Sequence, residues 1–91
     1  MERLNNLVIR AQAGDLEAFG RLVGATQTMA YAVARGVLRD SGMAEDAAQE
    51  SYLRAFRRLR DLDEPAGFVT WLRRIVITLR QKLEASDGEA N

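Results

Sequence analysis

Residues 68–83 have the sequence FVTWLRRIVITLRQKL, and the spacing of their apolar side chains decides the fold class. Apolar residues recur every three or four positions, which is the period of an amphipathic α-helix and not of a strand. Pro65 is tolerated in a first helical turn, so the sequence predicts a helix over 65–83 with Asp63 as its cap. Its predicted buried stripe holds Phe68, Leu72, Ile75, Val76, Leu79 and Leu83.

The same period predicts three helices upstream. A short N-terminal helix ends at Gly14, and Asp15 caps a long helix over 16–38 whose stripe runs from Phe19 to Val37. A turn over 39–42 leads to a third helix over 43–60. Its predicted core stripe holds Ala44, Ala47, Ala48, Ser51, Tyr52, Ala55, Phe56 and Leu59.

These helices define the expected architecture. No segment alternates with period two, so the fold class is all-α, a compact bundle of three long helices plus a short N-terminal helix. The 91 residues suit one domain, which we place at 1–83. Residues 84–91 are small, polar and acidic, and they are expected to form a disordered tail.

Composition excludes several kinds of chemistry. The chain has no cysteine and no histidine, so it lacks thiolate ligands, a cysteine nucleophile and the commonest general base. Carboxylates cluster at 45, 46 and 50, where a helix N-terminus explains them without a metal. We therefore expect no catalytic residue, no metal and no cofactor. Lacking a secretory signal and a long apolar stretch, the chain is expected to be cytoplasmic.

The formal net charge is zero, but the charges are segregated. Residues 40–53 hold four acids and no base, whereas residues 54–82 hold eight bases and three acids. A neutral chain with such blocks can still present a basic face to nucleic acid.

Two surfaces could bind partners. One is a strip on the third helix that turns away from the alanine-rich stripe at spacings of i, i+3, i+4 and i+7: Asp46, Gln49, Glu50 and Leu53. A solvated face with one stray leucine would look the same. The segment from Phe68 to Lys82 holds four bases, no acid and Trp71, a composition suited to phosphates and bases. Alternatively, the aromatic residues there are core and the arginines are solvated.

Three motifs occur in a recognisable order: GDLEAF at 14–19, AEDAAQESYLRAF at 44–56 and FVTWLRRI at 68–75. In this order they resemble region 2 of bacterial extracytoplasmic-function (ECF) sigma factors, of the sigma-70 family. The resemblance covers about residues 10–80. It implies a role in transcription initiation and no enzymatic activity.

The resemblance also implies two binding surfaces. The third helix would dock on the clamp coiled coil of the RNA polymerase β′ subunit through Asp46, Gln49, Glu50, Leu53 and Arg54. The loop before the last helix and that helix's exposed face would bind and open the promoter minus-ten element on its non-template strand. The residues implicated are Leu62, Asp63, Phe68, Thr70, Arg73, Arg74, Ile77, Thr78 and Gln81.

The sequence departs from the family pattern on the DNA side. The family usually has a basic residue and an asparagine at the positions of Ile77 and Thr78, and further arginines where 84–91 are acidic. An alternative is therefore a sigma-like protein-interaction module that binds an anti-sigma factor without productive DNA binding. A complete factor also carries a C-terminal helix-turn-helix domain, for which these residues leave no room, so a fragment and a reduced protein both remain open.

Overall fold

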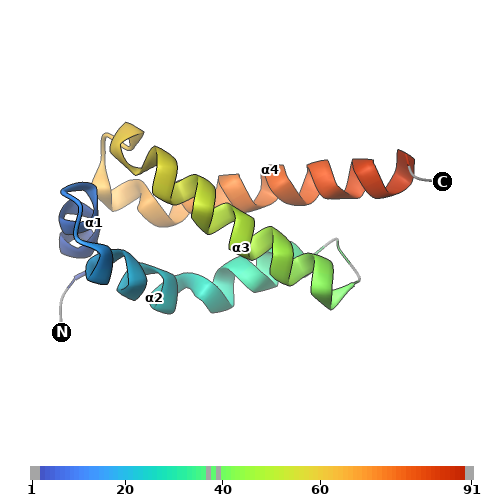
Figure 1. Ribbon diagram of the computed structural model, residues 1–91, viewed down its shortest axis with the longest axis horizontal. Helices are drawn as coiled ribbons and strands as arrows, with labels where there is room; N and C mark the ends of the chain where they lie inside the picture. Colours follow the sequence, from blue (N-terminus) through green and yellow to red (C-terminus); the bar gives the residue numbers. More distant parts are fainter. Residues whose placement is uncertain (1–2, 37, 39, 90–91) are drawn as a thin grey trace.

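The fold is helical along nearly its whole length. The computed structural model describes residues 3–36, 38 and 40–89, with side chains up to residue 83. It contains α1 (Leu4–Gln12), α2 (Leu16–Arg35), α3 (Ser41–Arg58) and α4 (Phe68–Glu89) (Figure 1). Two short 3-10 turns, Leu59–Asp61 and Pro65–Gly67, join α3 to α4. No strand occurs among the described residues, so the prediction of an all-α fold with three long helices and a short one is confirmed.

The corner between α1 and α2 forms as the sequence predicts. Gly14 has φ +101°, a conformation that glycine adopts without a Cβ penalty. Asp15 caps α2, because its Oδ1 accepts a hydrogen bond from the backbone N–H of Ala18 at 3.1 Å. The Arg10 guanidinium donates to Asp15 Oδ2 at 2.9 and 2.6 Å. This hydrogen bond from Arg10, with that from Ala18, lowers the pKa of Asp15.

The boundaries of α3 and α4 differ from those predicted. Helix α3 begins at Ser41, because Asp40 accepts from the backbone N–H of Met43 at 3.1 Å and starts the helix two residues early. Asp63 caps nothing; a 3-10 turn over Pro65–Gly67 precedes α4, with the Gly67 N–H donating to the Glu64 carbonyl at 2.8 Å. The predictions for Val37 and Arg39 lie outside the described residues.

Helix α4 continues to Glu89, past its expected end at residue 83. The extension holds no proline and includes residues such as Glu84 and Ala85 that favour a helix, so nothing in it forces an earlier stop. The domain boundary at 83 stays a prediction.

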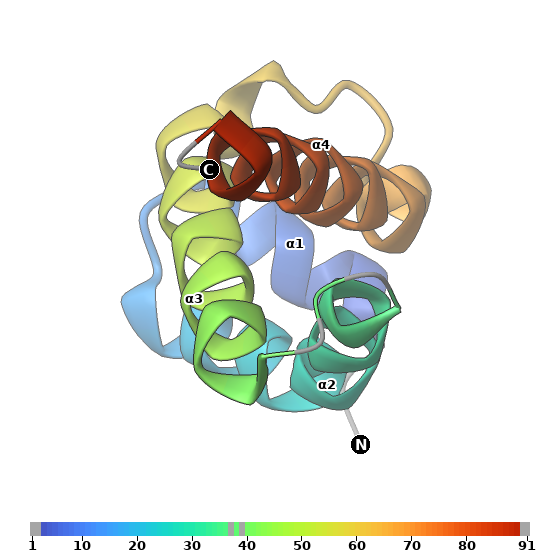
Figure 2. The ribbon, with the colours of Figure 1, turned by 90° about the vertical axis from the view of Figure 1, so that its right-hand side faces the viewer.

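The core consists of two apolar clusters. Near α1, Leu22, Phe68 and Leu72 pack together with Leu7 and Val8. Toward the other end of α2 and α3 the buried residues are mostly alanine, including Ala30, Ala44 and Ala47. Small side chains let the helices approach closely here. Figure 2 views the bundle end-on, with α2, α3 and α4 arranged about its long axis and α1 behind them.

Phe56 corrects the predicted core stripe of α3. Its side chain is 48% exposed, and its ring meets Phe19 of α2 edge-on with centroids 5.1 Å apart. The neighbouring Ala55 and, one turn later, Leu59 take the buried positions instead. The stripe is therefore narrower than the sequence pattern indicated.

Within the part of the chain that the structure describes, no helix is both long enough and apolar enough to span a bilayer.

Candidate functional site

The outward face of α3 carries the first predicted strip. Asp46, Gln49 and Leu53 are exposed, and Leu53 leaves 50% of its surface uncovered. Glu50 lies at the edge of this face and is partly buried. Arg54 is also partly buried, but it lines a groove against α4 and so leaves the strip. The structure thus groups four of the five predicted residues.

Phe56 extends this face, and sequence reasoning missed it. It follows Leu53 by three residues, so the two apolar side chains lie one above the other on α3. Beside Phe56 is a cleft of about 440 Å³, to which Leu16 of α2, 68% exposed, also contributes. The spacing from Leu53 was the signal that could have placed Phe56 outside the core. From here on, the α3 face means Asp46, Gln49, Glu50, Leu53 and Phe56.

The second predicted surface is the outward face of α4, which we call the α4 face. Most of its predicted members are exposed, and Ile77 is partly buried. Its two guanidinium groups, Arg73 and Arg74, are consecutive and solvent-facing. The α4 face comprises Thr70, Arg73, Arg74, Ile77, Thr78 and Gln81.

The loop residues predicted to contact DNA lie in different environments. The prediction that Phe68 contacts DNA is wrong, because its side chain is 2% exposed and packs in the core. Its ring lies near that of Trp71, with centroids 6.0 Å apart. Asp63 is exposed, while Leu62 is partly buried. Gln12 of α1 holds this segment by donating from Nε2 to the carbonyls of Leu59 at 3.0 Å and Leu62 at 2.8 Å.

One base of α4 faces inward. Arg80 donates from Nη1 to the Val33 carbonyl in the last turn of α2, at 2.8 Å. Its Nε is buried without a hydrogen-bond partner among the described residues. A Cβ at Gly36 would lie 3.0 Å from Arg80 Nη1, so the glycine leaves room for the guanidinium group. Arg80 therefore links α4 to α2 by a hydrogen bond, and it does not belong to the α4 face.

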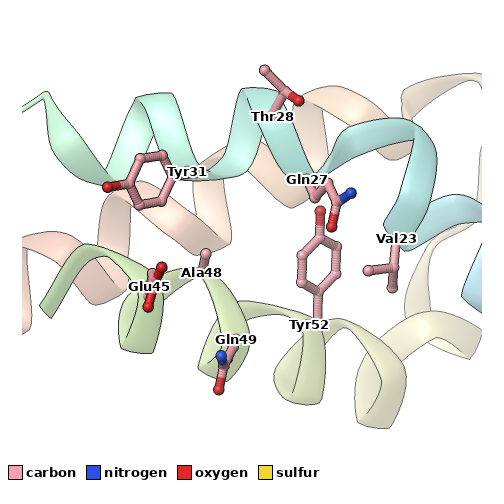
Figure 3. A pocket seen from close by; sticks show the side chains of 8 residues that line it. All are labelled: Val23, Gln27, Thr28, Tyr31, Glu45, Ala48, Gln49 and Tyr52. Atoms are coloured by element: carbon pink, nitrogen blue, oxygen red, sulfur yellow. The ribbon is translucent and has the colours of Figure 1, made fainter. Parts of the chain in front are cut away.

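A cleft of about 510 Å³ lies between side chains of α2 and α3, beside the α3 face (Figure 3). Figure 3 shows Tyr52 of α3 pointing toward α2, with Gln49 and Glu45 on the preceding turns of α3. The Tyr52 hydroxyl and Thr26 Oγ1 are hydrogen-bonded at 2.7 Å. Burial raises the pKa of Tyr52. Among the described residues, no three acidic side chains converge as a metal site would require.

Comparisons with known proteins point to one family. The sigma-70 region 2 family matches residues 22–82. The chain is 43% identical to the "Probable RNA polymerase sigma factor RfaY" of Xanthomonas campestris, over 84% of this chain and 19% of that protein. It is 37% identical to the RNA polymerase sigma-H factor of Pseudomonas aeruginosa, over 84% of this chain and 39% of the relative. The ECF RNA polymerase sigma-E factor of Salmonella typhimurium is also 37% identical, over 90% of this chain and 42% of the relative. The chain thus spans less than half the length of these three relatives.

Proposed function

The chain belongs to the sigma-70 region 2 family, and we propose that it docks on core RNA polymerase through the α3 face and binds the promoter minus-ten element through the α4 face. It would act by binding and not by catalysis. In this proposal the polymerase element is the clamp coiled coil of the β′ subunit, and the DNA is the non-template strand.

One observation carries the docking proposal: two large apolar side chains stand exposed together on a polar helix. Leu53 and Phe56 leave 50% and 48% of their surfaces uncovered. Exposed apolar pairs with a polar rim are typical of contact surfaces. Asp46 and Glu50 lie on the same face, so the surface complements a basic helical partner with an apolar stripe.

The DNA proposal rests on the charge of the α4 face. Arg73 and Arg74 offer guanidinium groups to phosphates, and Thr70 is exposed one turn before them. The segment that Gln12 fixes is followed by the 3-10 turn Pro65–Gly67 and then by this helix, so we treat loop and helix as one surface. Binding energy gained on a single strand would offset the cost of opening the duplex.

A polymerase-binding assay tests the docking. Leu53→Asp should weaken capture of core polymerase about tenfold or more, since it places a charge where an apolar anchor is expected. Ile9→Asp is the matched control, because Ile9 on α1 is 53% exposed and lies outside the α3 face. Equal binding by the two variants would refute the proposed docking surface.

A second assay separates this proposal from the protein-interaction module. That alternative gains support from Arg80, which faces inward and leaves fewer bases for DNA. Titrating a fluorescent non-template oligonucleotide at low salt should show binding that the double variant Arg73→Ala, Arg74→Ala weakens. If the wild-type chain captures polymerase or a regulator but never binds the oligonucleotide, the module is the better description.

A further inference from the structure

Charged side chains and one leucine form a seam along the outward side of α3, and this seam extends past the end of the α3 face. Its members follow one another at alternating spacings of four and three residues, as the contact positions of a two-helix coiled coil do. All are exposed except Glu50, which is partly buried, and the last stands in the 3-10 turn that directly follows α3. We call these residues the α3 seam: Asp46, Glu50, Leu53, Arg57 and Arg60.

The two halves of the α3 seam have opposite charge. Before Leu53 it holds two carboxylates, and after Leu53 it holds two guanidinium groups. Within the part of the chain that the structure describes, none of these four groups forms an ion pair. Arg57 and Arg60 line the cleft beside Phe56, so the basic half borders open space. All four charges are therefore available to a partner whose own charges run in the reverse order.

The dipole of α3 explains only the basic half. Arg57 lies in the last turn, where a cation is favourable. The first turn of α3 holds no acidic residue, and Glu50 lies in the middle of the helix, where the dipole has no effect on it. The order of charges along the seam thus needs another explanation.

A second copy of the chain carries the required reverse order. When two α3 helices pack antiparallel about a two-fold axis at Leu53, residues equally far from Leu53 on its two sides lie opposite one another. Asp46 precedes Leu53 by seven residues and Arg60 follows it by seven, so each meets the other in the second copy. Glu50 comes within reach of Arg57 of the second copy, and the two Leu53 side chains meet at the axis. A parallel pair would instead place like charges together.

We propose that two copies of this chain associate through the α3 seam as an antiparallel, two-fold symmetric dimer. Its interface is centred on a single pair of helices, smaller than the interface of an obligate dimer, so the dimer forms at high protein concentration and dissociates on dilution. Association covers Leu53 and therefore competes with the docking of polymerase on the α3 face. Only this competition rests on the proposed function.

Sedimentation equilibrium on the intact chain at low salt, from about 10 μM to about 1 mM, tests the dimer. We expect a reversible monomer–dimer equilibrium that weakens when salt is raised, because exposed ion pairs are screened. Asp46→Arg and Arg60→Asp should each weaken association about fivefold or more, because each places like charges opposite one another. An equimolar mixture of these two variants should associate like the wild type, because their heterodimer restores both ion pairs.

Arg58→Asp is the matched control, because it reverses the same charge on the side of α3 that faces α4. Its association should stay within about twofold of the wild type, since a charge outside the interface is screened. Circular dichroism melting verifies that each variant folds. If the three variants associate alike, or if the mixture does not recover, the antiparallel seam is refuted. A wild-type chain that stays monomeric over the whole concentration range refutes the dimer itself.

Capture of core polymerase separates this inference from the proposed function. Arg60 lies outside the α3 face, so Arg60→Asp should capture polymerase at least as well as the wild type while failing to dimerise. If the wild type dimerises but does not capture polymerase, the docking proposal fails and the dimer stands. If it captures polymerase without dimerising, the dimer is refuted and the docking proposal stands.

Discussion

Replacing Arg80 by methionine should destabilise the domain without weakening DNA binding. The hydrogen bond from Arg80 Nη1 to the Val33 carbonyl is 2.8 Å long. A hydrogen bond from a charged donor contributes about 1.5–3 kcal/mol, and a cation at a helix C-terminus adds about 0.3–1 kcal/mol. Arg80 is only partly buried and its Nε has no hydrogen-bond partner among the described residues, so the contributions of the hydrogen bond and of the helix C-terminus are both reduced. A net loss of about 1–2 kcal/mol follows.

Methionine retains an apolar stem of similar length, so the substitution removes the charge and the donor with little change in packing. For a domain of this size, the expected loss lowers the melting temperature by about 5–15 °C. Lys82→Met is the control, since Lys82 is an exposed cation on the same helix. Thermal melts and oligonucleotide titrations are run on both variants. If Arg80→Met melts like Lys82→Met but loses DNA binding, the structural role assigned to Arg80 is wrong.

Two further predictions concern pH. Hydrogen bonds from Arg10 and Ala18 lower the pKa of Asp15, so the folded state gains stability that is present at neutral pH and lost as pH falls below about 4. The variant Asp15→Asn should therefore be less stable than the wild type in urea at pH 7, and it should lose less stability when the solution is acidified. Burial raises the pKa of Tyr52, so the stability of the domain should fall as pH rises above about 10, and Tyr52→Phe should flatten that decline. The same variant should lose about 1 kcal/mol of stability at pH 7, because it removes the hydrogen bond to Thr26. Parallel urea titrations check both, and unchanged pH profiles would contradict the two assignments.

Local signals predicted most of the fold because they depend on neighbours in sequence. The apolar period of 68–83 fixes which side of α4 is buried, and Phe68, Leu72 and Val76 are indeed in the core. Asp15 likewise caps a helix whose first turn follows it directly. The start of α3 was predicted two residues late because Gly42 favours a turn, whereas the Asp40 cap keeps it helical.

The candidate surfaces were harder to predict because they depend on which helix covers which side chain. Arg80 counts as one more base in the sequence, yet it meets the carbonyl of Val33, 47 residues away. Phe56 belongs by type in a core, but the bundle leaves it open beside Phe19. No spacing within α4 reveals the contact of Arg80 with α2, whereas the spacing from Leu53 could have indicated that Phe56 is exposed.

Neighbouring residues of α3 lie in different surroundings, as Leu53 and Arg54 show. Leu53 and Arg54 are consecutive, and consecutive helical residues point about 100° apart. Leu53 therefore lies on the exposed α3 face while Arg54 enters the groove against α4. A partner covering Leu53 and Phe56 leaves the α4 side of α3 uncovered. Under the proposed function, polymerase bound at the α3 face would therefore leave that side of α3 open, and Gln12 holds the turn after α3 through the carbonyls of Leu59 and Leu62.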